Sequence, residues 1–511
     1  MIDATLALRL LAAYRARRLA VQDAAEAQRA TLLKLVRRAA ATRFGVDHDF
    51  ATIDGVDAFR ARVPLRCYED FWRDYWQAAF PRLTNLTWPG VIPFFAVTSG
   101  TTTGATKYIP CSRAMLRSNR RAGLDLVVHH LRQRPDSRIM GGKAFMLGGS
   151  TSLVEEAPGI HSGDISGIAI HDMPWWGHGR YFPPPALAAM TDWEEKVARL
   201  ATASRDEDIR LFGGTPSWVL LFCEALAAFK PGTARLAEFY PELELLVHGG
   251  INFAPYRARF EALLEGSHAE LREVYPASEG FFAVADRGAN EGLRLILDHG
   301  IFYEFVPVGE LDAPVPTRHR IGEIETGVEY AIAVSTCAGA WAYLVGDTVR
   351  FVSRDPPRVL VTGRTAYMLS AFGEHLIDAE IEAAVAQAAS AIDANVSDYS
   401  VGPLYPEGTE TLGGHLFIVE FAEDAVGAER IRAFATALDA ALAATNADYA
   451  THRTGGYGLK PPSVEAVGPG AFAAWMKQRG KLGGQHKVPR VITDPGLLDD
   501  LRRFAVTHPS V

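Results

Sequence analysis

Short apolar runs alternate with longer amphipathic stretches between about residue 90 and residue 360. The short runs have the length and composition of buried β-strands, and the longer stretches show the three- and four-residue spacing of helices. The predicted strands are Ile92–Val97, Ala144–Leu147, Leu243–Val247, Arg272–Tyr275, Gly300–Pro307, Glu329–Val334 and Val349–Val352. The predicted helices are Arg113–Arg132, Trp193–Ala203, Ser217–Phe229 and Tyr256–Leu264. Such alternation predicts an α/β fold.

The pattern differs on either side of this region. The segment up to about residue 80 is rich in Ala, Leu and Arg and is predicted to be helical. Beyond residue 364, a spacing of four residues predicts one apolar helix face, made by Ile377, Ile381 and Val385. A strand and a second helix follow, at His415–Phe421 and Ala428–Ala444. We therefore predict a large domain over residues 1–365 and a small α+β domain over residues 366–511.

Composition narrows the class of protein. The 511 residues are 48% hydrophobic and 22% charged, which is typical of a globular protein with an ample core. The net charge of −8 indicates no nucleic-acid partner. The four cysteines are far apart, which favours a reducing, cytoplasmic location and disfavours a metal cluster built on them. No run of about 18 apolar residues is present, so we expect no membrane span.

The first predicted helix, between Leu6 and Leu19, mixes leucines with four arginines and lacks the order of a signal peptide. We expect it to pack on its own protein as a surface helix. The alternative is a basic amphipathic helix that lies on a membrane surface.

The most informative run follows the strand predicted at Ile92–Val97. It carries hydroxyl groups and glycines and ends in a lysine, with Thr98, Ser99, Gly100, Thr101, Thr102, Gly104 and Lys107 as its members. Glycines let backbone N–H groups approach an anion, hydroxyl groups add donors, and the lysine adds a positive charge. The run therefore predicts a polyphosphate-binding loop. It is not a Walker A sequence, because that motif has four residues between its glycines and a lysine directly after the second. An ordinary polar surface turn is the alternative.

Three further signals accompany this loop. Tyr275 ends a predicted strand and Glu279 follows it, where a ring can stack on a purine and a carboxylate can hold Mg²⁺. Asp347 sits in a Gly-Asp pair between apolar runs, a hairpin-like pattern in which the carboxylate can accept two ribose hydroxyls. Lys487, in a glycine-rich segment, can neutralise charge that develops at phosphorus. Taken singly, each of these is also compatible with a helix cap, an ordinary turn or a solvated lysine.

The stretch from 161 to 185 is aromatic and proline-rich and includes Trp175 and Trp176. It fits the lining of an apolar acid pocket, and it fits a packed irregular loop equally well. The spacing of His161, His171 and His178 is too irregular to favour a metal site.

The order of these signals resembles the adenylate-forming superfamily of acyl-CoA synthetases, luciferases and peptide-synthetase adenylation domains. The details are most similar to one branch, the auxin-responsive Gretchen Hagen family of acyl-acid amido synthetases. The similar segments are Thr98–Lys107, Tyr275–Glu279, Tyr343–Arg350, Gly373–Leu376 and Gln485–Arg490. The chain departs from the family pattern at Pro276 and His375, and its Val247–Gly250 segment looks more like the wider superfamily.

The resemblance implies a large adenylate-forming domain with mixed sheets and helices, and a small mobile domain that carries the adenylation lysine. It implies ATP and Mg²⁺ as cofactors, Lys487 and Lys107 as catalytic residues, and Glu279 as the metal ligand. The implied nucleotide-binding residues are Thr98, Ser99, Gly100, Thr101, Thr102, Tyr275, Ser278, Glu279, Asp347 and Arg364. Arg364 also lies where the family's hinge would be, and Gly249, Gly250, Trp175 and Trp176 are candidates for the acyl pocket.

The implied reaction joins a small carboxylic acid to AMP with release of pyrophosphate. An amine, such as an amino acid, then takes the acyl group and AMP leaves. The alternatives are an acyl-CoA synthetase, a nucleotide-binding homologue without catalysis, and a phosphotransferase that releases ADP. The sequence does not identify the acid, the acceptor or the oligomeric state.

Overall fold

The computed structural model divides the chain into two compact units, and most of the chain up to Thr365 belongs to the first. The part from Ala366 onward belongs to the second, together with two short segments that precede it in the chain. The structure describes residues 3–98, 106–148, 151–174, 177, 179–190, 192–230, 235–249, 253, 256–288, 291–311, 313–365, 368–369, 371–374, 376–406, 410–423, 426–453, 458–479 and 488–507.

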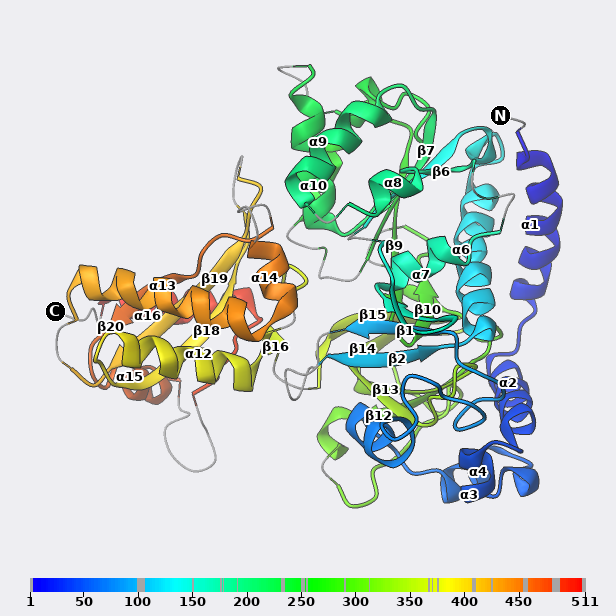
Figure 1. Cartoon of the computed structure of the whole chain (residues 1–511), viewed down its shortest axis with the longest axis horizontal. Helices are drawn as coiled ribbons and strands as arrows, with labels where there is room; N and C mark the ends of the chain where they lie inside the picture. The colour runs from blue at the N-terminus through cyan, green and yellow to red at the C-terminus, as the bar shows by residue number, and fades with distance from the viewer. Residues whose placement is uncertain are drawn as a thin grey trace. The chain divides into compact units, whose positions relative to one another are not determined.

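An eleven-stranded mixed sheet runs through the large unit (Figure 1). Its strands, in spatial order, are β12 (Ile301–Pro307), β13 (Glu329–Thr336), β14 (Tyr343–Arg354), β15 (Pro357–Arg364), β11 (Leu293–Leu295), β10 (Gly280–Val284), β9 (Glu270–Ala277), β8 (Leu245–Gly249), β7 (Ile209–Gly214), β3 (Lys143–Leu147) and β6 (Tyr181–Phe182). The pairs from β12 to β9 are antiparallel, and those from β9 to β6 are parallel. All seven strands predicted before residue 360 are present, although their ends differ.

A second sheet of the large unit has four strands. They are β2 (Lys107–Cys111), β1 (Phe94–Thr98), β5 (Ile160–Gly163) and β4 (Val154–Ala157). The helices of this unit are α1 (Thr5–Ala20), α2 (Ala24–Ala39), α3 (Arg43–Asp47), α4 (Val56–Arg62), α5 (Tyr68–Phe71), α6 (Arg113–Gln133), α7 (Ile165–His171), α8 (Pro185–Ala188), α9 (Trp193–Ser204), α10 (Pro216–Ala227) and α11 (Arg257–Leu263). The four helices predicted in this region are confirmed, with ends shifted by a few residues at most.

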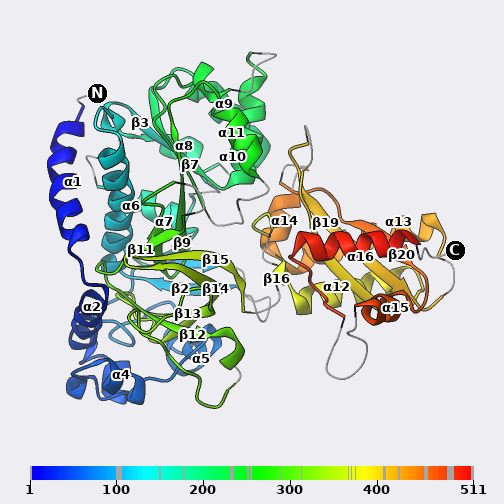
Figure 2. The same cartoon turned by 180° about the vertical axis from the view of Figure 1, so that it is seen from behind.

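The first helix packs on its own unit, as expected. Figures 1 and 2 show α1 alongside α6, and α6 in turn packs on β10. Small side chains allow this close approach, because Ala12 and Ala16 of α1 lie in one buried cluster with Ala122 and Leu126 of α6. In the described residues, no helix is long and apolar enough to span a bilayer.

The small unit is built on β18 (Val396–Leu404), β19 (Gly414–Phe421) and β20 (Ser463–Val467). Every residue of β19 is buried, and Leu416–Val419 is continuously apolar because the strand is covered on both faces. Phe417 and Val419 join a cluster with α12 (Asp378–Ala391) and α13 (Ala428–Thr445), whereas Leu416 and Ile418 face α15 (Ala471–Gln478) and α16 (Pro495–Thr507). The remaining elements are β16 (Met368–Leu369), β17 (Leu376–Ile377) and α14 (Ala447–Arg453).

Two predictions made from the pattern are wrong. Gly346 and Asp347 form no hairpin turn, because β14 continues through them. Gly346 has a φ of 94°, and the register with β15 shifts between Thr348 and Val349, so the strand bends without reversing. Ile377 does not lie on a helix face, because it pairs with Met368 across β16 and β17 and the helix begins one residue later.

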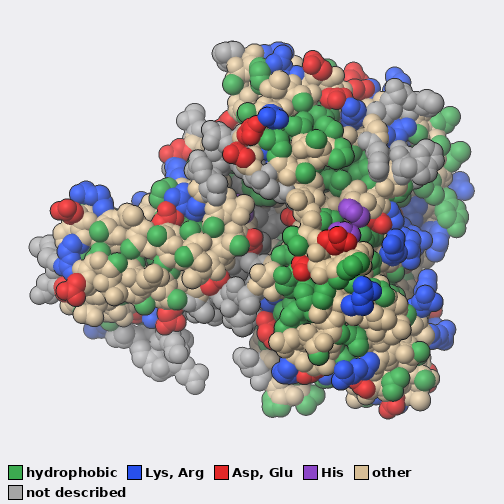
Figure 3. Space-filling view, in the orientation of Figure 1, with side chains coloured by type: hydrophobic (Ala, Val, Ile, Leu, Met, Phe, Trp, Pro, Cys, Tyr) green, Lys and Arg blue, Asp and Glu red, His purple; other side chains and the backbone are tan. Residues whose placement is uncertain are grey.

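Charged side chains of both signs are mixed over the face of the molecule drawn in Figure 3. Blue Lys and Arg side chains gather along the right-hand side of the large unit in this view, where few red side chains are visible.

Candidate functional site

A β-hairpin carries the two ends of the hydroxyl- and glycine-rich run. Strands β1 and β2 are antiparallel, and Thr98 lies opposite Lys107 in their register. The run therefore leaves the end of one strand and returns at the start of its neighbour, whereas a Walker A loop leads into a helix. The residues between them that we singled out, Ser99, Gly100, Thr101, Thr102 and Gly104, lie outside the described residues.

Lys107 lies in a polar cluster at the start of β2. Its Nζ is 2.9 Å from Oε1 of Glu69 and lies 5.0 Å from the centroid of the Tyr68 ring. Its side chain is 9% exposed, so the charge is largely removed from water. A buried ammonium group needs a counter-charge and a polarisable neighbour, and Glu69 and Tyr68 supply them.

Glu69 is a residue that the sequence analysis missed. It lies on α5, a helix of a single turn whose pattern is too short to show a buried face. Burial alone would raise the pKa of Glu69, but the hydrogen bond and the charge of Lys107 bring the pKa below its usual value. The carboxylate is therefore ionised at neutral pH and forms a true ion pair with Lys107.

Tyr275 and Asp347 come from strands that are not neighbours in the sheet. Tyr275 is on β9 and Asp347 is on β14, and the tyrosine hydroxyl donates a hydrogen bond of 2.5 Å to Oδ2 of Asp347. Both residues are buried. The tyrosine thereby fixes the orientation of the carboxylate that we expect to bind ribose.

Ser278 and Glu279 form the two-residue turn between β9 and β10. The hydroxyl of Tyr343, at the start of β14, hydrogen-bonds to the Glu279 carboxylate. Burial raises the pKa of Tyr343, and the charge of Glu279 raises it further, so the phenol stays protonated as a donor. A half-buried carboxylate held in this way fits a Mg²⁺ ion, which in proteins is usually bound by one or two carboxylates together with substrate phosphates.

The turn of Glu279 lies at the edge of the sheet where ligands are commonly bound in α/β folds. The parallel strands β8 and β9 end at Gly249 and Ala277, so both lead to this carboxyl edge. A Cβ at Gly249 would lie 2.3 Å from the carbonyl oxygen of Val274, so close packing of β8 on β9 already requires this glycine. Its role in an acyl pocket stays a prediction.

Several predicted site residues lie outside the described residues. They are Gly250, Trp175, Trp176 and Lys487, and of Arg364 only the backbone is described, opposite Asp347 in the register of β14 and β15.

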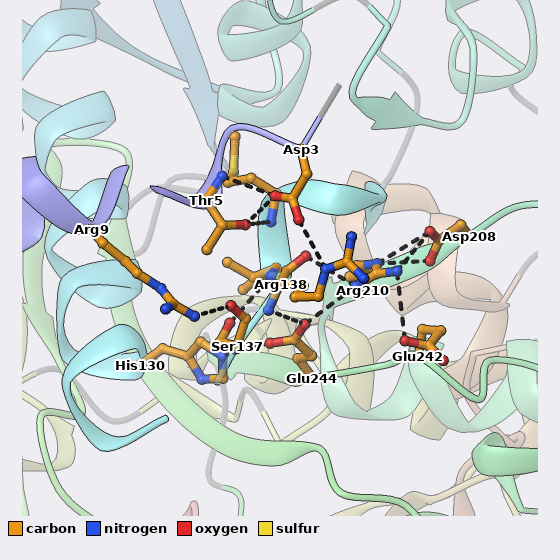
Figure 4. A network of polar contacts seen from close by, with 12 residues as sticks. Asp3, Thr5, Arg9, His130, Ser137, Arg138, Asp208, Arg210, Glu242 and Glu244 are labelled. Atoms are coloured by element: carbon orange, nitrogen blue, oxygen red, sulfur yellow. Dashed lines mark hydrogen bonds and ion pairs between the residues drawn. The ribbon is translucent and has the colours of Figure 1, made fainter. Parts of the chain in front are cut away.

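The opposite, amino edge of the parallel strands carries a polar network, drawn in Figure 4. A surface cleft of about 260 Å³ lies there, lined in part by His130, Arg210 and Glu244. Glu244 accepts the backbone N–H of Arg138 at 2.8 Å, and Arg210 bonds to Asp208 at 3.0 Å. These groups satisfy one another's hydrogen-bonding capacity, which is typical of a structural network at the edge away from the site.

The described residues contain one group of three possible metal ligands, Asp125, Asp298 and His299. The guanidinium of Arg15 lies between the two carboxylates, with Nη2 2.7 Å from an oxygen of each. A cation of the protein itself therefore balances these charges. His161 and His171 lie with their ring centroids 5.1 Å apart, and His178 is outside the described residues.

Three family models match the chain. The GH3 family N-terminal domain matches residues 15–197, the GH3 family central domain matches residues 294–364, and the GH3 family C-terminal domain matches residues 379–496. The chain belongs to the GH3 family. The matched segments include β1, β2, β14 and Lys487, although not the turn that carries Glu279.

Curated relatives are named as amido synthetases. The chain is 28% identical over 247 residues to the probable indole-3-acetic acid-amido synthetase GH3.9 of Oryza sativa subsp. japonica, covering 44% of this chain and 54% of the relative. It is 24% identical over 246 residues to the indole-3-acetic acid-amido synthetase GH3.3 of Arabidopsis thaliana, covering 46% and 41%. The chain thus spans about half the length of the curated relatives that it matches.

Solved structures share the fold of this GH3 protein. The AtGH3.15 acyl acid amido synthetase in complex with 2,4-DB has a TM-score of 0.58 at 17% identity, covering 97% of this chain and 96% of that one. The 2-hydroxyisobutyryl-CoA ligase with 2-HIB-AMP and CoA has a TM-score of 0.57 at 19% identity, covering 94% and 92%. The predicted fold class, a large mixed α/β unit with a smaller α+β unit, is confirmed.

Proposed function

We propose that this GH3 protein is an ATP-dependent ligase that adenylates a carboxylic acid and transfers the acyl group to an amine, an amino acid in the first instance. The observation that carries the proposal is one unit in which Tyr275 orients Asp347, Tyr343 holds Glu279, and Lys107 ends the hydroxyl-rich run. These are the groups that a protein needs to bind a nucleoside triphosphate. Membership of the GH3 family supports the amide-forming second step.

We propose the domain division that goes with this function. A large domain, residues 1–365, binds ATP and the acid, and a small mobile domain, residues 366–511, brings Lys487. Arg364 lies at the hinge between them. The clustering of the chain into units that meet at Thr365 supports the boundary.

The mechanism follows from charge. The carboxylate of the substrate and the α-phosphate of ATP repel each other, so the protein must supply positive charge and donors to bring them together. Lys107, the hydroxyl groups from Thr98 to Thr102 and Lys487 would supply these, and each such contact contributes about 3 kcal/mol in the transition state. Glu279 would hold Mg²⁺, which supplies charge neutralisation at the phosphate oxygens when bound. Tyr275 and Asp347 orient the nucleoside and so reduce the entropic part of the barrier.

The names of the relatives guide the choice of acid. Since they are indole-3-acetic acid-amido synthetases, aryl-acetic acids are the first class to test, together with shorter aliphatic acids. We propose Trp175, Trp176, Gly249 and Gly250 as the lining of the acyl pocket.

The second candidate function is acyl-CoA synthesis. The CoA ligase has almost the same TM-score as the GH3 amido synthetase, so the fold suits a thiol acceptor as well as an amine. Adenylation is common to both functions, and only the acceptor separates them.

The test has two stages. Pyrophosphate release is measured with ATP, Mg²⁺ and a panel of acids, and the productive mixture is then given amino acids or CoA and the conjugates are identified by mass spectrometry. An amide with release of AMP supports the proposal, and a thioester would replace it with the second candidate. Release of ADP, or no pyrophosphate release with any acid, would contradict both.

The adenylation lysine is tested separately. We expect Lys487→Ala to lower acyl-adenylate formation by about 100-fold, the scale for loss of one transition-state donor. Lys477→Ala, which removes an exposed lysine from α15 of the same unit, is the matched control. Wild-type rates in Lys487→Ala would remove this residue from the role.

A further inference from the structure

The ion pair of Lys107 and Glu69 joins the proposed phosphate-binding run to a helix that no motif includes. Nζ of Lys107 and Oε1 of Glu69 are 2.9 Å apart, and the Glu69 side chain is 33% exposed against 9% for Lys107. A lysine side chain carries a compact charge on a flexible stem of four carbons. Its ammonium group therefore stays in one position only when a neighbour holds it.

The backbone around Glu69 is fastened on two sides. The N–H of Arg66 donates to the carbonyl of Ala342 at 3.1 Å, and the N–H of Leu344 donates to the carbonyl of Arg66 at 2.9 Å, which ties the start of α5 to β14. On the other side, the hydroxyl of Tyr68 accepts the N–H of Tyr108 on β2 at 3.0 Å. The helix is therefore fixed between the strand of Asp347 and the strand of Lys107, and Glu69 is fixed with it.

The charge of Glu69 also reaches Tyr343, the partner of the proposed metal ligand. The charges of Glu279 and Glu69 and the phenol of Tyr68 all act on the buried hydroxyl of Tyr343. The charge of Glu69 thus acts both on the lysine at the end of the phosphate-binding run and on Tyr343, the partner of Glu279.

We propose that Glu69 is the positioning residue for Lys107. Its negative charge weakens the attraction of Lys107 for the triphosphate, but it holds the ammonium group in one position. The proposal rests on the proposed function, because a fixed ammonium group speeds the reaction only if Lys107 acts on the phosphates of ATP. With Glu69 ionised, the pair carries little net charge and attracts a polyanion weakly. The ammonium is nevertheless held on one side, so less reorganisation is needed when charge develops on the reacting phosphate.

This arrangement predicts opposite effects on binding and on rate when only the charge of Glu69 is removed. Glu69→Gln leaves an isosteric side chain next to a lysine that now has an uncompensated charge. We expect the Kd for the non-hydrolysable analogue α,β-methylene-ATP to fall about threefold, because a nearby negative charge is gone. We expect the rate of acyl-adenylate formation to fall about tenfold, because the ammonium is no longer held. A residue that only supported the fold would weaken binding or leave it unchanged.

The double mutant shows whether Glu69 acts through Lys107. In a Lys107→Met background, Glu69→Gln is expected to change neither the Kd nor the rate by more than about twofold, since the group it positions is absent. Glu69→Asp keeps the charge with a shorter reach. It should keep the wild-type Kd and lose part of the rate, and it serves as the test if Glu69→Gln does not fold. The matched control is Glu26→Gln, which breaks an exposed pair of similar length, 2.8 Å, on α2.

Weaker binding of the analogue by Glu69→Gln would overturn the proposal, and so would either of two further outcomes. One is a Glu69→Gln protein whose analogue Kd and adenylation rate both stay at the wild-type values. The other is the same pair of changes in the Lys107→Met background, which would mean that Glu69 acts on something else. If the wild-type protein releases no pyrophosphate with any acid, the proposed function fails, but the analogue Kd still reports whether Glu69 and Lys107 are coupled.

Discussion

The hydrogen bond between Tyr275 and Asp347 connects two motifs that the sequence shows separately. At 2.5 Å, between two buried groups, it holds the carboxylate in one orientation. We expect Tyr275→Phe to raise the KM for ATP about fivefold, since one such hydrogen bond contributes about 1 kcal/mol. The KM is measured in the pyrophosphate-release assay at saturating acid.

A buried tyrosine far from the site gives the control for this variant. The hydroxyl of Tyr240 bonds to Oγ of Ser204 at 2.7 Å, so Tyr240→Phe removes a similar hydrogen bond from the same unit. It should lower the melting temperature and leave the KM for ATP unchanged. An equal rise of KM in both variants would mean that the effect reports loosening of the unit, with no specific role for Asp347.

At the residue scale, the sequence gives the types of group in the site and misses how they are held. Lys107, Glu279 and Asp347 stand out because each follows an apolar run in a recognisable pattern. Glu69 and the bond from Tyr275 to Asp347 are products of tertiary packing. A one-turn helix has no periodicity, and a contact between residues 72 positions apart leaves no local signal.

The first helix illustrates how an element is held by one side chain. Arg15 of α1 bonds to Asp125 of α6 and to Asp298, which follows β11, and all three side chains are largely buried. Burial alone would raise the pKa of Asp125, but hydrogen bonds from Arg15 and His299 lower it to about 2. Arg15→Ala would leave two buried carboxylates without this partner. We expect the free energy of unfolding of the large unit to fall by about 3 kcal/mol, measured by urea denaturation.

The control for Arg15 is an exposed arginine. Arg29 pairs with Glu26 at 2.8 Å on α2, where both side chains are more than half exposed, and such pairs are weakened by screening in water. Arg29→Ala should leave the urea midpoint unchanged. If Arg15→Ala behaved in the same way, the buried network would not hold α1 to α6.

A buried carboxylate in the small unit, Glu374, makes the stability of that unit depend on pH. Glu374 accepts the backbone N–H groups of Ala371 and Phe372 at 3.0 and 2.7 Å and contacts Nε2 of His415 at 2.8 Å. Burial alone would raise the pKa of Glu374, but the charge and hydrogen bond of His415 and the backbone bonds hold it below its usual value.

The sign of the pH effect follows from that lowered pKa. A carboxyl whose pKa is lower in the folded state contributes stability that is complete above its unfolded pKa of about 4.3, and this is lost as the pH falls through the folded pKa. We expect the small unit to lose stability between about pH 5 and pH 3, and Glu374→Gln to flatten that dependence. Urea unfolding from pH 3 to pH 7 measures it. Glu429→Gln, at an exposed position of α13, should keep the wild-type slope.

At the element scale, periodicity predicted most helices and strands. It failed where strand pairing in the tertiary structure overrode a local turn signal. The Gly-Asp pair of β14 is a common turn signal, yet pairing with both β13 and β15 keeps the strand continuous through Gly346. The order of the eleven strands was not predicted, because hydrophobic spacing indicates that a strand is buried but not which strand lies beside it.

At the scale of the whole molecule, each hydrophobic cluster formed by the described residues lies within one unit. The cluster of Phe44 and Trp341 lies in the large unit, and the cluster of Phe434 and Tyr449 lies in the small unit. Since cooperative unfolding follows a packed core, we expect two transitions in differential scanning calorimetry.

The stability variants above assign these transitions without cutting the chain. Arg15→Ala changes only contacts inside the large unit, and Glu374→Gln changes only contacts inside the small unit, so each should lower one melting temperature and leave the other in place. The nucleotide analogue adds a third, independent test. It should raise the transition that responds to Arg15→Ala, because Tyr275, Asp347 and Glu279 all belong to the large unit. A single transition that both variants lower equally would mean that the two cores unfold as one.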